Sequence, residues 1–467
     1  MVLPAPHPAQ GVAARGHESF PGKLGAAQAQ EVWRLAWPAI AHMLLLTAVF
    51  VVDRALIGKT SDDALASLQI STVLLWTLGG VFTAFSTATL AIAGRAIGSG
   101  NPAEAARAAA TSIVFALLTG VGVAACARVF APPLLGSVFP NAGPAVMADV
   151  HAYLNIAVFA LPLVFLEAAM AAVLQAGGDT KSPLRAALLG NSLNLVISGS
   201  LVFGLGGLPR LGVVGVAIGA SVAALTEVAV LSSVLAKRGG VIDLRASGLV
   251  WDGALAARLL RVASPAMADK LVYAGGYFAF VALIGVLGPL AMAANQLISS
   301  VEAVCFLTAE GIGIAAASLV AQRMGARQSE GAATSLRAAA WLAVAIAAPL
   351  GLFFAVAAAP LLRLFGGSQA VVGLGAISLA VAGLSQPFMA YATVVRMALR
   401  GAGATRSVLA VTLAGTLLVR LPLGYLLAVQ LGLGLTGIWL ACLADWLVEA
   451  AALSLVVRHG GWKSARV

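Results

Sequence analysis

The stretch LAWPAIAHMLLLTAVFVVDRALIGK at 35–59 is apolar over a length that can cross the hydrocarbon core of a membrane as one helix. Parts of it, and the Arg34 that precedes it, return in the second half of the chain at an offset of 227 residues, in the pairs Arg34 and Arg261, Ala36 and Ala263, and Pro38 and Pro265. The run ALIG at 55–58 recurs at 282–285, and QAGGDTKSPL at 175–184 is answered by RGAGATRSVL at 400–409. The chain is therefore an internal duplication of a membrane-spanning unit.

The composition extends this conclusion to the rest of the chain. Of the 467 residues, 61% are hydrophobic and 10% are charged, with a mean hydropathy of +0.98, whereas soluble domains carry about 25% charged residues. Twelve apolar segments follow one another, at 33–57, 67–95, 109–130, 150–175, 184–204, 211–236, 256–286, 291–321, 334–358, 374–399, 407–430 and 433–457. Because lipid cannot satisfy backbone hydrogen bonds, we expect an all-α polytopic membrane protein with twelve transmembrane helices.

Each half has an even number of segments, so both halves begin and end on the same side of the membrane and form a parallel repeat. We expect two six-helix lobes around a central cleft. The predicted organisation is a disordered cytoplasmic tail, an N-terminal lobe, a cytoplasmic linker, a C-terminal lobe and a second tail, at 1–30, 31–236, 237–258, 259–458 and 459–467. The linker could be a hinge between rigid lobes or a plain solvated connection.

The net charge of +10 reflects membrane topology. With the amino terminus in the cytoplasm, 21 of the 28 Lys and Arg residues fall in the tails and the loops on that side, and only Lys270 and Arg420 are assigned to helices. This positive-inside bias predicts a multi-pass protein of the inner (plasma) membrane with both termini in the cytoplasm. Basic residues are not interleaved with aromatic ones, so no nucleic-acid partner is expected.

Asp53 is the first candidate for a coupling residue, because it lies in the first apolar segment. A carboxylate in the membrane interior costs about 2.5–3.5 kcal/mol on insertion scales, and such residues normally serve a pathway or a relay. A proton and a cationic substrate could compete for its single negative charge. Alternatively, Asp53 is an interfacial acid paired with Arg54 or Lys59. His42 lies about 20° away around the helix and could relay protons or bond to a neighbouring helix.

A polar stripe runs along the fifth apolar segment, where Asn191, Asn194 and Ser198 have the spacing i, i+3 and i+7. In a bilayer this stripe must face protein or a wet cavity. With Asp53 it could form a cation or proton site, or it could simply join two helices. Pro38 interrupts the backbone hydrogen bonds of the first helix, so it is either a kink that responds to Asp53 or a tolerated proline.

The second half offers a less defined polar site. Further acids lie in or near the apolar segments of both halves, namely Glu167, Glu227, Asp269, Glu302, Glu310, Asp445 and Glu449. The candidates for a substrate or second-lobe polar site are Glu310, Arg420, Tyr273 and Gln296. An ion pair between Arg420 and one of the acids is the structural alternative, and Asp269 and Lys270 could neutralise each other.

No signature of enzymatic chemistry appears. The chain has no Walker loop, HExxH, GxSxG or Gly-rich dinucleotide turn in a suitable context, so we expect neither an enzyme nor a cofactor. Its cysteines, Cys126, Cys305 and Cys442, fall at unrelated spacings and are interpreted as packing residues, so no metal site is expected. Any transport would have to use an ion gradient.

Several motifs resemble the multidrug and toxic compound extrusion (MATE) family: the stretch at 35–59, QAGGDTKSP at 175–183, NSLNLVIS at 191–198, ALRGAGATRS at 398–407 and RLPLGYLL at 420–427. The resemblance covers residues 31–458. It implies a twelve-helix pair of lobes around a cleft, and cation-coupled antiport of organic, often cationic and amphipathic, compounds. The expected partners are a small-molecule organic substrate, a coupling cation and the lipid bilayer, and a monomer is expected.

Within the family, the chain looks more similar to the DinF type than to the NorM type. The NorM pattern places acids where this chain has Tyr273 and, nearby, Met389. The fifteen-residue spacing from Pro38 to Asp53 instead matches the proton-responsive first helix of DinF-type members. Those members often have an Asp in the fifth helix at the position of Ser198, so this departure leaves both proton and sodium coupling open.

Three alternatives remain at this point. A sodium-coupled drug antiporter differs only in the coupling ion. A flippase for a lipid-linked saccharide, on a related bundle, tends toward fourteen helices and a strongly basic cavity, whereas only Lys270 and Arg420 are expected as cations within helices here. A non-transporting scaffold or receptor is disfavoured by the duplication and by the intramembrane carboxylates.

Overall fold

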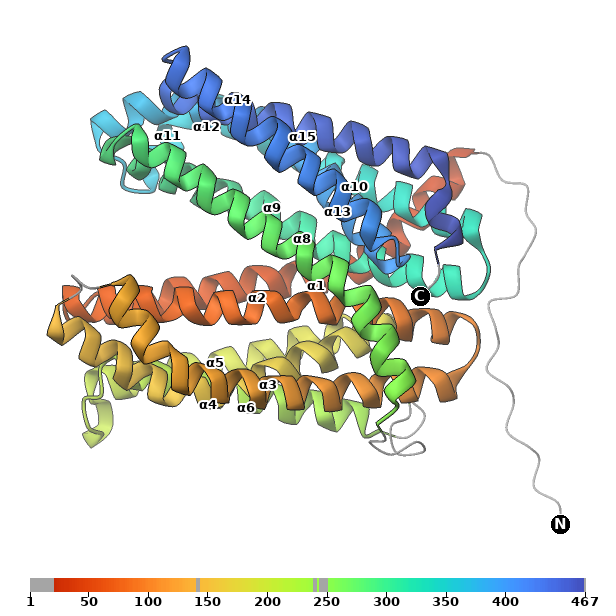
Figure 1. The fold of residues 1–467 in the computed structure, drawn as a ribbon, viewed down its shortest axis with the longest axis horizontal. Coiled ribbons are helices and arrows are strands. Elements are labelled where there is room, and N and C mark those ends of the chain that lie inside the picture. Colours follow the sequence, from red (N-terminus) through yellow and green to blue (C-terminus); the bar gives the residue numbers. More distant parts are fainter. Residues whose placement is uncertain (1–20, 140–142, 238–241, 243–250, 466–467) are drawn as a thin grey trace.

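The computed structural model describes residues 21–139, 143–237, 242 and 251–465 (Figure 1). Across these ranges it contains no strand and has twelve helices long and apolar enough to cross a membrane, which confirms the predicted fold class. The helices of the first half are α1 (Pro21–Ile57), α2 (Asp62–Gly98), α3 (Pro102–Val138), α4 (Pro144–Ala176), α5 (Lys181–Phe203) and α6 (Val213–Leu235).

The second half repeats this order with one irregular member. Its long helices are α8 (Gly253–Val286), α9 (Pro289–Gly325), α10 (Ser329–Val356), α12 (Gln369–Gly401) and α15 (Gly434–His459). The eleventh span combines α13 (Thr405–Ala414) and α14 (Leu421–Tyr425) with two π-helical turns, η2 (Gly415–Arg420) and η3 (Leu426–Gln430). The short helices are η1 (Leu205–Gly207), α11 (Ala358–Leu364) and η4 (Gly461–Ser464).

The expected boundaries need two corrections. Helix α1 begins at Pro21, so residues 21–30 are helical and not part of a disordered tail, while residues 1–20 lie outside the described ranges. Helix α8 begins at Gly253, so the end of the expected linker 237–258 is helical. Asp252 explains this start, because its side chain accepts hydrogen bonds from the first backbone N–H groups of α8. The remainder of the linker, 238–241 and 243–250, is not described.

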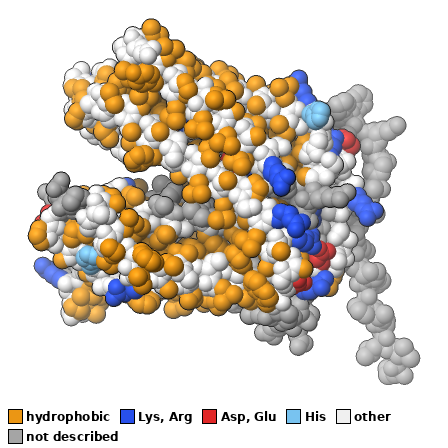
Figure 2. Space-filling view, in the orientation of Figure 1, with side chains coloured by type: hydrophobic (Ala, Val, Ile, Leu, Met, Phe, Trp, Pro, Cys, Tyr) orange, Lys and Arg blue, Asp and Glu red, His pale blue; other side chains and the backbone are white. Residues whose placement is uncertain are grey.

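The two halves form two lobes that diverge toward one end of the molecule. Figure 1 shows α1–α6 in one lobe and α8–α15 in the other. Figure 2 shows a deep cleft between the lobes that is open at the end away from the carboxyl terminus. Hydrophobic side chains cover both lobes in this view, and most of the visible charged side chains lie at the end near the carboxyl terminus.

The opening helix of each half packs in the core of the opposite lobe. At the start of α1, Val32, Leu35 and Ala36 are buried in a cluster formed by α9, α10, α12 and α15 of the second lobe. At the start of α8, the residues 227 positions later belong to the core of the first lobe, namely Leu259, Val262 and Ala263. Both helices therefore pass from one lobe to the other, and Pro38 and Pro265 follow these buried segments in α1 and α8.

The closed end of the cleft is built from close contacts between α2 and α9. A methyl group on Gly98 would overlap the backbone carbonyl of Gln322, and one on Gly325 would overlap the carbonyl of Arg95. These two contacts are related by the offset of 227 residues. Glycine is therefore required at both positions, because it alone lets the two backbones approach this closely.

Side chains from the same two helices hold the lobes together at this end. The Arg95 guanidinium donates to the carbonyl oxygen of Ala402 at 2.6 Å and to that of Ala465 at 2.9 Å. In the equivalent position of the other half, Gln322 donates to the carbonyl oxygen of Ala176 at 2.7 Å. Each donor reaches a helix C-terminus in the opposite lobe, where backbone carbonyls lack helical partners.

Candidate functional site

The first lobe contains a hydrogen-bonded chain of three polar side chains, which joins Asp53 to two of the three residues of the polar stripe. The side chain of Asp53 in α1 is buried, and its Oδ1 accepts a hydrogen bond from Asn194 Nδ2 at 3.4 Å. Asn194 Oδ1 accepts in turn from Ser198 Oγ at 2.8 Å. This arrangement fixes the Asn194 amide, with its NH₂ group toward the carboxylate and its oxygen toward the hydroxyl.

Asp53 does not behave as an interfacial acid. Asp53 is 8% exposed, and among the described residues no cation lies within ion-pair distance of it. Its neighbours Arg54 and Lys59 are exposed. Asp53 is therefore not a surface carboxylate paired with Arg54 or Lys59. The hydrogen bond found for its carboxylate among the described residues comes from the neutral amide of Asn194.

Helix α6 completes this site by coming very close to α5. The Cα of Gly219 faces Asn194 and Ser198, and a methyl group there would lie 2.5 Å from Asn194 Oδ1 and would overlap Ser198 Oγ. Gly219 therefore leaves the space in which the amide and the hydroxyl meet.

Gly219→Ala is expected to disrupt this site. The added methyl group must displace both polar side chains, and overpacking of this kind typically costs about 1–3 kcal/mol. We expect a lower unfolding temperature in detergent and weaker gradient-driven transport. Gly199→Ala is the matched control, because a methyl group on Gly199 of α5 meets nothing within 4 Å. Equal behaviour of the two variants would contradict this account of Gly219.

Two other residues named by the sequence analysis do not join this hydrogen-bonded chain. Asn191 is half-buried, and its Nδ2 is buried without a hydrogen-bond partner. His42 is also buried, and its Nδ1 has no partner. Within the described part of the chain no hydrogen bond connects His42 to Asp53, so the structure provides no direct relay between them.

The second lobe contains ion pairs between buried side chains. Arg420 Nε donates to Asp445 Oδ2 at 2.7 Å, and Nη2 of the same guanidinium lies 2.6 Å from that oxygen. Both side chains are buried. The expected ion pair between Arg420 and one of the acids is therefore confirmed, and Arg420 is not free to bind a substrate on its own.

Two further arginines in ion pairs, the buried Arg396 and the half-buried Arg400, were not expected from the sequence. Arg396 lies 3.1 Å from Glu449, and Arg400 pairs with Asp269. The ion-pair partner of Asp269 is therefore Arg400 of α12, and no direct ion pair between Asp269 and Lys270 is found among the described residues. Both arginines had been counted as charges of the cytoplasmic side. Arg396 lies within the expected tenth segment 374–399, which was a signal that it faces the protein interior.

The ring of Trp446 and the π-helical turn η2 lie next to these ion pairs. The Trp446 ring centroid lies 5.3 Å from the Arg396 guanidinium and 5.1 Å from that of Arg420, so the ring makes cation–π contacts with both arginines. The π-helical turn η2 ends at Arg420, and such turns often re-aim side chains at functional sites. At its start, a methyl group on Gly415 would lie 2.5 Å from Asp445 Oδ1.

The remaining second-lobe candidates separate into two groups. Tyr273, Glu302 and Glu310 are partly buried, and the two acids both act electrostatically on Tyr273. Gln296, by contrast, is exposed near the start of α9, and the structure does not bring its side chain to this group. Thus Tyr273 and Glu310 belong together, whereas Gln296 stands apart.

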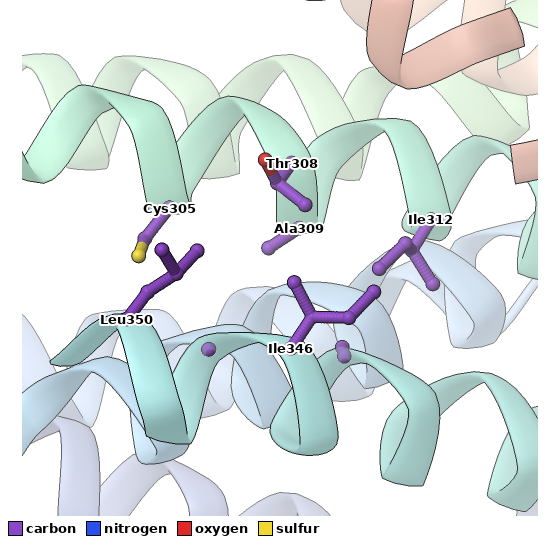
Figure 3. Close-up of a pocket in the computed structure, with 8 residues that line it drawn as sticks. Cys305, Thr308, Ala309, Ile312, Ile346 and Leu350 are labelled. Atoms are coloured by element: carbon purple, nitrogen blue, oxygen red, sulfur yellow. The ribbon is translucent and has the colours of Figure 1, made fainter. Parts of the chain in front are cut away.

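One apolar pocket and the described His, Cys, Asp and Glu side chains provide no further site for a polar ligand or a metal, respectively. The pocket in Figure 3 lies between α9 and α10, is lined almost entirely by apolar groups such as Ile312 and Leu350, and has no room for a water molecule. Within the same ranges no group of three or more His, Cys, Asp or Glu side chains is arranged to hold a metal ion.

Comparison with known proteins connects this geometry to a family. The MatE family model matches residues 38–198 and 265–426, one segment in each lobe. A "Probable multidrug resistance protein NorM" of Deinococcus radiodurans is 30% identical over 451 residues, covering 92% of this chain and 95% of that protein. A protein of the same name from Thermotoga maritima is 26% identical over 441 residues, covering 94% of each chain.

The fold is also shared with solved structures. The Vibrio cholerae MATE transporter VcmN in the bent form superposes with a TM-score of 0.86 at 20% sequence identity, covering 94% of this chain and 99% of that one. A structure described as MATE in the straight conformation reaches a TM-score of 0.84 at 19% identity, covering 92% of this chain and 96% of that one.

Proposed function

The chain belongs to the MatE family of membrane transporters, and we propose that it is a secondary active antiporter that exports organic, often cationic and amphipathic, compounds in exchange for protons. Members of this family are transporters and not enzymes, and multidrug resistance proteins related over their whole length support the transport of small-molecule compounds. The direction of transport and the coupling proton are our proposal.

Proton coupling is supported above all by the buried environment of the Asp53 carboxylate. It is a buried carboxylate that accepts a hydrogen bond from a neutral amide, and among the residues that the structure describes no cation forms an ion pair with it. Desolvation disfavours such a charge, so the carboxyl group gains stability by binding either a proton or a cationic substrate. Competition between the two for one site is sufficient for antiport.

Alternating access is supported by the way α1 is anchored. The start of α1 packs in the second lobe, whereas Asp53 near its other end is bonded to α5 of the first lobe. Pro38 lies between these two anchored parts and removes a backbone hydrogen bond. A change at Asp53 could therefore be transmitted to the angle between the lobes through bending of α1 at Pro38.

We also propose an orientation in the inner membrane. Both termini are assigned to the cytoplasm, because the positive-inside rule applies to the distribution of Lys and Arg. The cleft is open at the end away from the carboxyl terminus (Figure 2), so on this assignment the structure corresponds to an outward-open state. We propose a monomer, since each lobe already completes the core of the other.

Sodium coupling is the second candidate, and one observation favours it. Asp53, Asn194 and Ser198 together offer a carboxylate, an amide oxygen and a hydroxyl oxygen, which are the ligand types that hard cations prefer. The spacing of Pro38 and Asp53, with Tyr273 and Met389 in place of acids, favours the DinF-type branch and a proton. The twelve spans disfavour the flippase alternative.

Cationic-dye flux in proteoliposomes tests the proposal. The purified full-length chain is reconstituted in sodium-free buffer, and an imposed pH gradient is expected to drive dye accumulation that collapses when a protonophore is added. A sodium gradient applied without a pH gradient is the control. Accumulation driven only by sodium would establish the second candidate, and no accumulation under either gradient would contradict antiport of cationic compounds.

A further inference from the structure

We propose that the chain binds the phosphate group of an anionic phospholipid in a pocket between the start of α13 and the end of α15. We call it the tail pocket, and its lining includes Ser407, Leu455, Arg458, His459 and Trp462. Its volume of about 640 Å³ lies in the range of sites for small molecules, so a lipid headgroup fits in it. The proposal goes beyond the transported compound and the coupling ion.

The first argument comes from the internal duplication, because the first half binds a carboxylate at the equivalent place. Asp179 lies just before α5, and its Oδ1 accepts hydrogen bonds from the backbone N–H groups of Lys181 and Ser182 at 3.1 and 2.9 Å. Its Oδ2 accepts from Ser182 Oγ at 2.6 Å. An anion therefore satisfies the start of α5, whose N–H groups have no partners within the helix.

The second half has kept the donors and lost this carboxylate. At the offset of 225 residues, Ser407 corresponds to Ser182, whereas Ala404 stands in the place of Asp179. No side chain caps the start of α13, and Ser407 is exposed in the tail pocket. An anion from outside the chain can therefore take the position that the Asp179 carboxylate occupies in the first half.

The second argument is the charge of the tail pocket. Arg458 and His459 are exposed in the last turn of α15, and among the described residues no acid forms an ion pair with either. The described residues that line the pocket include no acid. A phosphate would therefore find a guanidinium, an imidazole and a helix start, whereas the cationic group of a zwitterionic lipid would find no partner.

The third argument is the position of the tail pocket at the membrane surface. One membrane span begins at Thr405 and another ends at His459, so the pocket lies at the level of lipid headgroups. Leu455, one turn before His459, is 65% exposed, and an acyl chain can continue from the pocket along this side of α15. The positive-inside orientation proposed above places this end in the cytoplasmic leaflet, which carries anionic lipids. These features favour a phospholipid over a soluble phosphate.

The walls of the tail pocket are held in place by contacts within the chain. Gly460, with φ +77°, ends α15 and turns the chain back. The Trp462 side chain is then 3% exposed, and its Nε1 donates to the carbonyl oxygen of Val457 at 3.2 Å. Lys463 Nζ pairs with Glu330 of α10 at 2.7 Å. The pocket therefore exists before a lipid arrives, which lowers the entropic cost of binding.

Native mass spectrometry of the full-length chain in detergent tests the proposal. It measures the affinities for phosphatidylglycerol, which is anionic, and for phosphatidylcholine with the same acyl chains, which is zwitterionic. We expect the wild type to bind phosphatidylglycerol more tightly. The ratio of the two affinities should fall about tenfold or more in Arg458→Gln, as for a lost hydrogen bond to a charged group.

Ala404→Asp tests the role of the helix start separately. The new carboxylate is expected to cap α13 as Asp179 caps α5, and to repel the phosphate. The affinity ratio should therefore fall in this variant also. A thermal unfolding curve shows whether each variant is folded, and Arg458→Gln, at an exposed position, should unfold at the temperature of the wild type.

Arg185→Gln is the control, because Arg185 is exposed near the start of α5, where Asp179 already supplies the anion. It removes the same charge and should leave the affinity ratio unchanged. Equal affinities in the wild type, an unchanged ratio in Arg458→Gln, or an equal fall in Arg185→Gln would each overturn the proposal. Displacement of the lipid by an equal concentration of glycerol 3-phosphate would also overturn it, because the site would then accept a soluble phosphate. The assay uses no ion gradient, so its outcome does not depend on antiport.

Discussion

Asp53→Asn is expected to reduce dye accumulation driven by a pH gradient to the level of protein-free vesicles. The amide cannot exchange a proton in this range, so the site loses the competition between proton and cationic substrate that drives antiport. The substitution preserves the shape of the side chain and removes a buried charge. Among the described residues, the hydrogen bond found for this carboxylate comes from Asn194. The variant should therefore fold at least as well as the wild type, which separates a loss of coupling from a loss of structure.

The measurement is the flux assay in proteoliposomes, together with a thermal unfolding curve in detergent. Asp63→Asn is the matched control, because Asp63 is an exposed acid at the start of α2 and the substitution is the same. We expect wild-type flux for this control. Gradient-driven flux that survives Asp53→Asn would show that coupling lies elsewhere, with Glu310 as the next residue to test.

Arg420→Met is expected to lower the free energy of unfolding by about 3–5 kcal/mol, because it leaves the buried Asp445 carboxylate without its partner. Asp445 is wholly buried, and Trp446 also loses one of its two cation–π contacts. Arg420→Met combined with Asp445→Leu removes both charges and should recover most of the loss. The recovery distinguishes an unpaired charge from a simple packing defect.

Chemical unfolding in detergent, measured for both single variants and the double variant, gives the coupling free energy of the pair. Arg363→Met is the control, because Arg363 in α11 is exposed, and it should change stability by less than about 0.5 kcal/mol. Additive losses in the double variant would contradict a dominant role for the Arg420–Asp445 pair.

The fold was predictable because a chain in lipid has few ways to satisfy its backbone hydrogen bonds. Apolar runs of sufficient length must be helices, and their number and repetition gave the twelve spans and two lobes. The bond between Asp53 and Asn194 was also predictable, since a buried carboxylate and a polar stripe on a membrane helix both need a partner inside the protein.

The second lobe was less predictable, for a physical reason. Arg396 and Arg400 lie near the end of a helix, where sequence alone cannot distinguish a side chain that reaches the cytoplasm from one that turns inward. Their acids come from α15 and α8, which are distant in sequence. The π-helical turn that ends at Arg420 shifts the helix register. Its sequence, GTLLVR, contains no residue pattern from which a π-helical turn could be predicted. In the sequence, Gln296 could not be distinguished from the other candidates for a second-lobe polar site, but in the structure its side chain is exposed.

The exchange of opening helices between the lobes also has an evolutionary meaning. A protein made of one such half would expose the apolar start of its first helix, represented here by Val32 and Leu35, with nothing to cover it. Two copies could solve this by inserting those segments into each other, which is the geometry of a domain-swapped dimer. The present chain can therefore be understood as a swapped dimer fused into one polypeptide. Once the subunits are joined, each is free to diverge, and the first could keep Asp53 bonded to a neutral amide while the second acquired its ion pairs.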